Sequence, residues 1–207
     1  MNARQIRESF EDLKEEKIED NRFFKWINQI DLALYREMIN LKAEDFAQEA
    51  IYEISGGNPN QDLPTDFYSI NPESCGVFSV DTEESPISQF AYTGYNSKKV
   101  GFYIKAGKIH LTGNINGKIM LRYIPAKTII TSEDDLLIGD LEFTEFYEQS
   151  LNELYSIYEE EAENEIISKK RAQKSLKEVL YKYQENSTPI KMRNADVYGF
   201  YFSLGKK

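Results

Sequence analysis

Two series of apolar residues at helical spacing occupy the N-terminal part of the chain. Over residues 3–17 the series consists of Ile6, Phe10 and Leu13, with Ile18 just beyond. From about residue 21 to residue 41 it consists of Trp26, Ile30, Ala33, Leu34, Met38 and Leu41. Steps of three and four place such side chains on one helix face. We expect two amphipathic helices, the second with Asp20 or Asn21 as its N-cap.

The pattern over residues 42–55 fits two kinds of element. The stretch AEDFAQEAIYEIS can continue a helix, whereas Ala50-Ile51-Tyr52 followed by Ile54 suits a strand. The turn cluster SGGNPNQ, residues 55–61, ends the segment in either case.

Short β-rich segments fill the middle of the chain. Between about residues 66 and 125 we count six: DFYSI, GVFSV, SQFAYTGY, VGFYIKAG, KIHLTG and KIMLRYIP. They are rich in aromatic and β-branched residues and are separated by Pro, Gly, Asn and Ser. This spacing predicts an antiparallel sheet or a small barrel, and not βαβ units.

The stretch GNINGK, residues 113–118, has two interpretations. A phosphate-binding loop reads G-x-x-x-x-G-K-[ST] and opens a helix, but here three residues separate Gly113 from Gly117 and Ile119 occupies the hydroxyl position. Alternating apolar residues flank the stretch on both sides, and Asn116-Gly117 is a strong signal for a tight β-turn. We therefore predict that the flanking strands form a hairpin.

After residue 130 helical spacing returns. An acidic turn, TSEDDLL, covers residues 131–137, and Asp140 is the expected N-cap of a helix whose apolar stripe is Leu141, Phe143, Phe146, Tyr147, Leu151, Leu154, Tyr155 and Tyr158. A second stripe contains Ile167, Ala172, Leu176, Val179, Leu180 and Tyr183. We expect an antiparallel helix pair that ends at Ser187 and Pro189.

The last residues alternate aromatic side chains in the manner of a strand. Tyr198, Phe200 and Phe202 would share one face, with Val197, Gly199 and Tyr201 on the other. A terminal strand of this kind exposed to water promotes aggregation. We expect it to pair with the sheet of its own chain or with a neighbouring molecule. The predicted partner-binding residues are Val197, Tyr198, Phe200, Tyr201 and Phe202.

Together these patterns predict an α+β protein in which a helical bundle carries an inserted antiparallel β-sheet or small barrel. Four regions are expected: N-terminal helices (1–45), a β-rich insertion (46–130), an amphipathic helix pair packed on the N-terminal helices (131–187) and a strand-like extension (188–207). The chain has 207 residues, a net charge of −10 and one cysteine, Cys75. These values suit a reducing cytoplasm and argue against broad binding to nucleic acid, and no apolar run is long enough for a membrane span.

The inventory of catalytic groups is small. His110 is the only histidine, and its alternation places it opposite Ile109 and Leu111 on a strand. Clusters of Cys and His that could bind zinc do not occur, the acidic runs lack the spacing of a calcium loop, and there is no G-x-S-x-G elbow. We predict no catalytic residue, metal or cofactor. A Ser-His-Asp arrangement formed in space stays an alternative, because its members need no sequence motif.

Four short motifs, in order, resemble the head–tail adaptor (connector) proteins of tailed bacteriophages. They are Trp26-Ile27-Asn28, Leu63-Pro64-Thr65-Asp66-Phe67, Leu121 to Pro125, and Thr131 to Asp135. The resemblance covers roughly residues 22–185. The β-segment 76–105, the charged helix before residue 20 and the tail after residue 188 depart from the pattern.

The resemblance implies a non-enzymatic virion protein at the capsid vertex, made in the cytoplasm of the bacterial host. Such adaptors form a ring, typically of twelve copies, on the portal protein, extend the DNA channel and dock the next tail component. Genomic DNA would pass without specific binding, and no membrane is involved. Acids near a helix junction would line the channel or form a plain solvated surface: Glu159, Glu160, Glu161, Glu163 and Glu165.

Two other functions remain open at this stage. A different neck ring, such as a stopper or tail-completion protein, would use the same kind of contacts. A small hydrolase would need a site that converges from scattered residues, with His110 as its most informative member.

Overall fold

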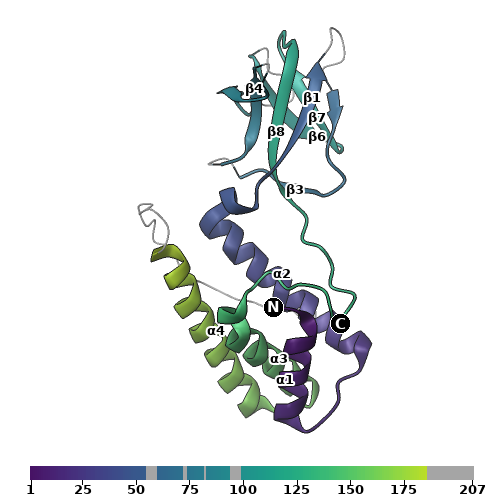
Figure 1. Cartoon of the computed structure of the whole chain (residues 1–207), viewed down its shortest axis with the longest axis vertical. Helices are drawn as coiled ribbons and strands as arrows, with labels where there is room; N and C mark the ends of the chain where they lie inside the picture. The colour runs from purple at the N-terminus through teal and green to yellow at the C-terminus, as the bar shows by residue number, and fades with distance from the viewer. Residues whose placement is uncertain (55–59, 72–73, 82, 94–98, 186–207) are drawn as a thin grey trace.

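The computed structural model describes residues 1–54, 60–71, 74–81, 83–93 and 99–185. Two parts of different secondary structure follow one another along the long axis (Figure 1). A bundle of helices contains both the beginning and the end of the described range, and antiparallel strands occupy the other end. The α+β class and the insertion of antiparallel β-structure between helices are confirmed.

Within the described ranges the bundle consists of four α-helices: α1 (Ala3–Lys14), α2 (Asp20–Lys42), α3 (Thr144–Tyr158) and α4 (Ala162–Glu185). They share one core, whose largest fully buried side chains are Tyr147, Phe10, Phe23 and Phe143. Helix α3 lies in the middle, because it packs against each of the other three. Helix α4 returns antiparallel to α3, so the predicted helix pair is confirmed.

The helix ends confirm one predicted cap and correct another. Asp140 accepts a hydrogen bond from the backbone N–H of Glu142 (2.9 Å) and caps the short 3-10 turn η2 (Leu141–Phe143) that leads into α3. The predicted cap of α2 is wrong, because Asp20 is already helical and no side-chain oxygen of Glu19 caps the helix. The negative charge of Asp20 in the first turn still interacts favourably with the dipole of α2.

Eight strands in the described ranges form two antiparallel sheets. The first sheet has the order β1-β8-β4-β5, with β3 also paired to β8, and the second has the order β2-β7-β6. Their bounds are β1 (Gln48–Ile54), β2 (Asn60–Asp62), β3 (Phe67–Ser69), β4 (Gly76–Val80), β5 (Pro86–Gln89), β6 (Gly101–Lys105), β7 (Lys108–Thr112) and β8 (Gly117–Pro125). For residues 42–55 the sequence allowed either a helix or a strand. In the structure this segment consists of a short 3-10 turn, η1 (Ala43–Phe46), followed by the strand β1.

The two sheets enclose one core and are joined along one side. The fully buried or nearly buried side chains between them are Ile54, Val77, Phe102, Ile109, Leu111, Ile119, Leu121 and Tyr123. Residues 90–93 run from β4 to β6: Phe90 N–H donates to Val77 O (2.8 Å), and Phe102 N–H donates to Ala91 O (3.0 Å). On the other side, among the described residues, no backbone hydrogen bond joins β1 to β2. The insertion is a small, partly open barrel.

The predicted hairpin across GNINGK is wrong. Strand β7 pairs with β6 and β2, whereas β8 pairs with β1, β3 and β4, so residues 113–116 connect the two sheets. The tight hairpin lies one strand earlier, between β6 and β7, where Ala106 (φ 51°) and Gly107 (φ 73°) form a two-residue turn with both φ values positive. The rejection of a phosphate loop is unaffected, because a strand and not a helix follows Gly117.

The barrel and the bundle meet at a small buried cluster. Its members are Tyr35, Ile39 and Ala43 from the end of α2 and its continuation, and Cys75 and Ile124 from the barrel. The Tyr35 hydroxyl donates to Pro125 O (2.7 Å) at the last residue of β8. Helix α2 therefore contributes to both cores, since its residues from Phe23 to Met38 include members of the bundle core, and Tyr35 and Ile39 contact the barrel.

Among the residues of the predicted apolar stripes whose side chains the structure describes, four are exposed. Leu13, Leu141, Tyr158 and Ile167 each lie near a helix end. Across the described ranges, every helix is too short or too polar to cross a membrane.

Candidate functional site

The five acids predicted to line a channel lie where α3 turns into α4. Glu160 adopts a left-handed conformation (φ 61°) that reverses the chain, and Glu161 N–H donates to Ser156 O (2.8 Å) to close the turn. Glu159, Glu160, Glu161 and Glu163 are exposed, and Glu165 is half-buried. The structure thus brings the five together at one corner of the bundle. Their orientation toward a channel stays a prediction, because a channel belongs to an assembly of several chains.

An aromatic contact fixes this corner to α2. The Arg22 guanidinium lies 3.8 Å from the centre of the Tyr158 ring, and the Trp26 and Tyr158 rings meet edge to face at 6.2 Å. Such contacts combine apolar burial with attraction of the cation to the ring. Trp26, the first residue of the resemblance motifs, therefore holds the α3–α4 corner in place.

The first and last resemblance motifs meet in the bundle. Asn28 on α2 accepts a hydrogen bond from Ile130 N–H (2.7 Å) and donates through its side-chain amide to Ile130 O (2.7 Å). Directly after Ile130, the Asp135 carboxylate accepts from the N–H groups of Thr131 (2.7 Å) and Ser132 (2.8 Å). These bonds stabilise the charged form and lower the pKa of Asp135. The acidic turn is thus a rigid element seated on α2.

The acidic turn also receives the N-terminus of α1. Ala3 N–H donates to Asp135 O (3.1 Å), and Arg4 N–H donates to Glu133 O (2.8 Å). These are two of the N–H groups that the first turn of a helix cannot satisfy internally. Asn2 completes the end of the helix, because its side chain accepts from Gln5 N–H (3.1 Å).

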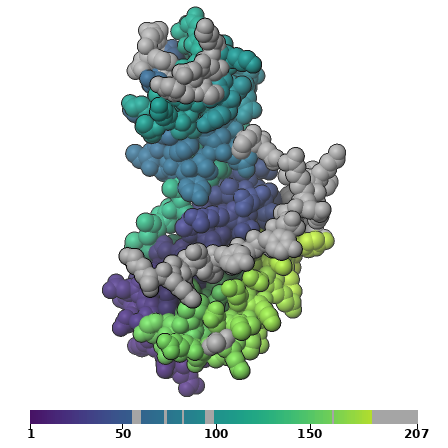
Figure 2. All heavy atoms as spheres, turned by 180° about the vertical axis from the view of Figure 1, so that it is seen from behind, coloured from purple at the N-terminus to yellow at the C-terminus, as the bar shows by residue number. Residues whose placement is uncertain are grey.

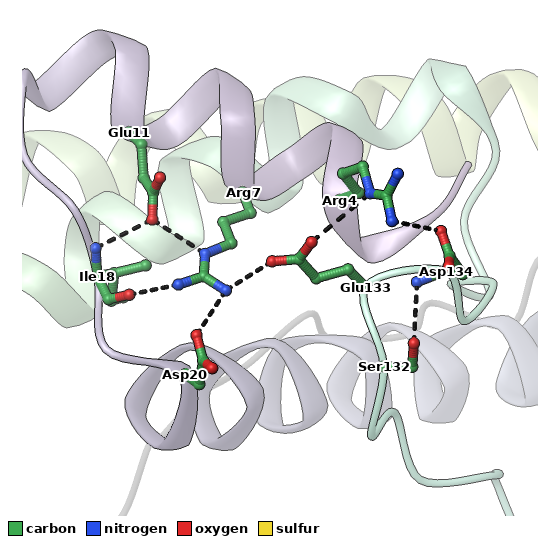
Figure 3. Close-up of polar contacts among 8 residues, drawn as sticks. All are labelled: Arg4, Arg7, Glu11, Ile18, Asp20, Ser132, Glu133 and Asp134. Carbon is green, nitrogen blue, oxygen red and sulfur yellow. Dashed lines mark hydrogen bonds and ion pairs between the residues drawn. The ribbon is translucent and has the colours of Figure 1, made fainter.

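A second link between α1 and the acidic turn is the side chain of Arg7 (Figure 3). Its guanidinium contacts the carboxylates of Glu11 (2.9 Å), Asp20 (2.8 Å) and Glu133 (2.6 Å) and donates to Ile18 O (2.6 Å). Burial alone would lower the pKa of Arg7, but the three carboxylates outweigh it and raise the pKa. Arg7 therefore joins α1, the start of α2 and the acidic turn.

The two middle motifs meet at the base of the barrel. Asp66 accepts a hydrogen bond from the Tyr123 hydroxyl (2.9 Å), and the rings of Phe67 and Tyr123 stack at 5.8 Å. Phe67 also pairs with Pro125 across β3 and β8. Burial, together with the bond to Asp66, raises the pKa of Tyr123 to about 12. The hydroxyl therefore stays protonated and acts as a structural donor.

A buried polar cluster lies between α2, α3 and the connection from the barrel. Asp31 is 1% exposed, and its carboxylate accepts from the Tyr147 hydroxyl and from Ile138 N–H (2.9 Å). Lys127 Nζ lies 2.7 Å from the same carboxylate, and Gly139 N–H donates to the Tyr147 oxygen (3.2 Å). Burial and the nearby Asp31 charge raise the pKa of Tyr147. Every group is engaged with another, which suits a structural support and leaves no free nucleophile or base.

A second buried carboxylate, Glu153, borders a small cavity. The cavity has a volume of about 20 Å³ and lies between α2, α3 and α4; its lining includes Ser150, Glu153, Lys169 and Gln173. Lys169 Nζ lies 3.7 Å from Glu153. Burial raises the pKa of Glu153, Lys169 opposes the shift, and Glu165 adds to it. A space of this size holds one or two waters and is too small for an organic substrate.

His110 stands on the face of β7 opposite the buried Ile109 and Leu111, as predicted. Its ring stacks on Tyr103 at 4.7 Å, and Nε2 lies 3.2 Å from Lys105 O. In the described part of the chain, no group of His, Cys, Asp and Glu could hold a metal ion. This environment is that of a packed strand histidine.

The predicted partner-binding residues Val197, Tyr198, Phe200, Tyr201 and Phe202 lie outside the described residues. Their role stays a prediction. No protein-family model matches the chain, and a search of curated proteins finds no match either. Function is therefore inferred from the residues and their geometry alone.

Sequence reasoning missed both buried acids. Asp31 follows Ile30 and precedes Leu34 by three residues, so a charged residue on an apolar stripe was the available signal. Glu153 gave a weaker signal, because it adjoins the apolar stripe of α3 without lying at its centre. In both cases the partners, Lys127 and Lys169, come from other segments and only the fold identifies them.

Proposed function

We propose that this protein is a structural head–tail adaptor of a tailed bacteriophage. About twelve copies would form a ring on the portal protein at the capsid vertex, extend the DNA channel and dock the next tail component. The protein would be made in the host cytoplasm and act in the virion through contacts and not through chemistry.

The observation that carries the proposal is the pairing of the four resemblance motifs in space. Trp26-Ile27-Asn28 contacts the segment that leads into Thr131–Asp135, through Asn28 and Ile130. Leu63–Phe67 contacts Leu121–Pro125, through Asp66, Phe67 and Tyr123. Motifs that are far apart in the chain thus form two local units, one in the bundle and one at the base of the barrel. Such pairing explains why they would occur together in a family with this architecture.

The shape of the molecule supports the same function. A bundle with helices on several sides can pack against copies of itself, while a barrel at one end offers a separate surface to another component (Figure 1). The two parts are held together by the small buried cluster that contains Tyr35 and Cys75, and by the ion pair between Asp31 and Lys127. A rigid connection of this kind suits a spacer between two partners.

The decisive experiment is native mass spectrometry of the protein, alone and mixed with a candidate portal ring. We expect a monomer alone, because ring formation would depend on the portal as template, and a complex whose added copies match the symmetry of the portal. A stable small oligomer that ignores the portal would contradict the proposal. Binding to a tail component but not to the portal would indicate a stopper or tail-completion protein instead.

A pair of variants separates assembly from catalysis. Tyr198→Ala with Phe200→Ala should abolish addition to the portal, because strand pairing and aromatic burial would both be weakened. His110→Ala should leave that addition unchanged. If His110→Ala instead removed a hydrolytic activity that the double variant retained, the protein would be a hydrolase.

A further inference from the structure

The outer face of α4 combines apolar and basic side chains. Ile166 and Ile167 are 54% and 48% exposed, and Tyr181 is 53% exposed. The residues Lys170, Lys174 and Lys177 lie between them on the same outward side, opposite the buried Ala172, Leu176 and Val179. Figure 2 shows this helix along one side of the bundle. Exposed isoleucine and tyrosine beside lysine are more typical of an interface than of a solvated helix face.

Most of these lysines have no partner of their own. Lys174 makes an exposed ion pair with Glu178 (3.7 Å), while Lys170 and Lys177 make none within the described part of the chain. Their side chains are free to meet acids of another molecule.

Helix α1 carries a stripe of opposite charge on its own outer face. Glu8 and Asp12 are exposed and, within the described residues, have no ion-pair partner. Arg4, which pairs with Glu133 and Asp134 of its own chain, lies one turn earlier on the same side and is positively charged. Leu13, which is 63% exposed, follows Asp12. Arg4, Glu8 and Asp12 are spaced by four residues, as are Lys170, Lys174 and Glu178 on α4.

The two stripes face away from each other and run in opposite directions. Helix α3 packs between α1 and α4, and both views show α1 and α4 on opposite sides of the bundle (Figures 1 and 2). Helix α1 runs parallel to α3, because Ser9 bonds Glu148 and Phe10 contacts Tyr155. Helix α4 is antiparallel to α3, so α1 and α4 are antiparallel to each other.

We propose that α4 of one copy packs against α1 of the next copy of this chain. In antiparallel register Lys170 meets Asp12, Lys174 meets Glu8, and Glu178 meets Arg4, so that all three pairs join opposite charges. In this register Ile167 is opposite Glu15, two positions beyond Leu13, so these two exposed apolar residues are offset by about 3 Å along the helix axis. The inference rests on the proposed ring of copies and names the two surfaces that form it.

The charge pattern selects a head-to-tail contact over a two-fold one. A two-fold dimer through α4 would place this net positive face against the same face of the other copy, which is repulsive. Contact between different surfaces repeats from copy to copy and closes into a ring when the rotation permits. Exposed ion pairs are worth at most about 1 kcal/mol each, so association of free chains is weak and a template helps to complete the ring.

Cysteine cross-linking tests the register. We substitute Glu8→Cys and Lys174→Cys in one chain, with the native Cys75 buried, and oxidise the protein at high concentration, alone and with a portal ring. A head-to-tail contact yields a ladder of dimers, trimers and larger covalent species. Each single substitution yields no ladder. The matched control, Glu8→Cys with the exposed barrel position Lys118→Cys, also yields none. Absence of a ladder in the double variant, in both conditions, overturns the assigned surfaces.

Charge reversal gives an independent test. In the chain without the introduced cysteines, Lys170→Glu with Lys174→Glu, or Glu8→Lys with Asp12→Lys, should abolish the association of copies that native mass spectrometry detects at high concentration, alone or with the portal ring, because like charges then face each other. Combining all four reversals in one chain should restore it. Mixing the two double-reversed proteins should also restore it, since each then offers the charge that the other needs. Failure of both rescues contradicts the register.

The tests also distinguish this inference from the proposed function and from another occupant. A ladder without binding to any portal would leave the interface standing and remove the adaptor role. Stoichiometric addition to the portal without a ladder would support the adaptor role and exclude the proposed contact between α4 and α1. If a labelled DNA duplex binds the chain, loses binding on Lys170→Glu with Lys174→Glu, and no ladder forms, the basic face of α4 binds nucleic acid and the contact between copies is excluded.

Discussion

The Tyr147 hydroxyl on α3 donates a hydrogen bond to the Asp31 carboxylate on α2, and both side chains are almost completely buried. The carboxylate is also contacted by Lys127 and by Ile138 N–H, which belong to the connection from the barrel. One acid thus joins two helices to the chain that returns from the insertion. Because buried polar groups cost free energy when a partner is missing, this cluster makes the bundle sensitive to single substitutions.

Tyr147→Phe should lower the free energy of unfolding by about 1–3 kcal/mol, because the Asp31 carboxylate loses its donor and Gly139 N–H loses its acceptor. Asp31→Ala should cost more, about 3–5 kcal/mol, since it leaves Lys127 without its counter-charge. Urea unfolding followed by the fluorescence of Trp26, the only tryptophan, measures both in the bundle. The exposed Asp12→Ala is the control and should change the value by less than about 0.5 kcal/mol.

Arg7 and Arg4 provide a matched pair on one helix. The Arg7 side chain is 14% exposed and contacts three carboxylates, whereas Arg4 is 48% exposed and contacts Glu133 and Asp134 at the surface. Arg7→Ala should destabilise the protein by about 2–4 kcal/mol, because it leaves partly buried acids unpaired. Arg4→Ala should cost at most about 1 kcal/mol. If both substitutions lowered the free energy of unfolding by the same amount in urea, the Arg7 contacts would be no more stabilising than the exposed ion pairs of Arg4.

Periodicity predicted the helices well because one apolar stripe per helix reports burial directly. The same signal failed for strand pairing. Asn116-Gly117 looked like a hairpin turn, yet β7 and β8 belong to different sheets, and the true hairpin uses Ala106-Gly107. Local turn preference does not reveal which strands become neighbours, since pairing depends on how two sheets close around one core. The pairing of β8 with β1 and β4 on its two sides joins segments that are distant in the sequence.

The candidate surfaces were predictable to different degrees. The corner acids, such as Glu160, were identified by their density in the sequence, and the α3–α4 turn explains why they cluster. The charge stripe from Arg4 to Asp12 was visible only as a charged helix, because its antiparallel match to Lys170 and Lys174 needs the directions of α1, α3 and α4. Contacts between sequentially remote segments supply that information.

Gly139 lies in a crowded position where the sequence gives no reason for a glycine. A Cβ there would lie 2.8 Å from a ring carbon of Tyr147, 2.9 Å from Phe143 Cβ and 3.0 Å from a methyl group of Leu34. Gly139→Ala should therefore destabilise by about 1–3 kcal/mol, although an alanine restricts the unfolded chain. Gly107→Asn, at a left-handed turn position with no atom within 4 Å, should cost much less in the same unfolding assay.

The buried Glu153 carboxyl makes the stability of the protein depend on pH. Burial raises the pKa of this carboxyl above its ordinary value of 4.5, so the folded protein holds the proton more tightly than the unfolded chain. Stability from this group is therefore present at low pH and is lost as pH rises from the unfolded pKa through the folded pKa.

Glu153→Gln removes that loss, because the amide is neutral at every pH. The difference in the free energy of unfolding, variant minus natural protein, should be near zero or negative at pH 4. It should rise by pH 7, so that the variant becomes relatively more stable. Urea titrations at several pH values measure the difference, and the exposed Glu163→Gln serves as control, with no comparable rise. A relative stability that falls toward neutral pH would show that the ion pair with Lys169 outweighs the cost of burying the charge.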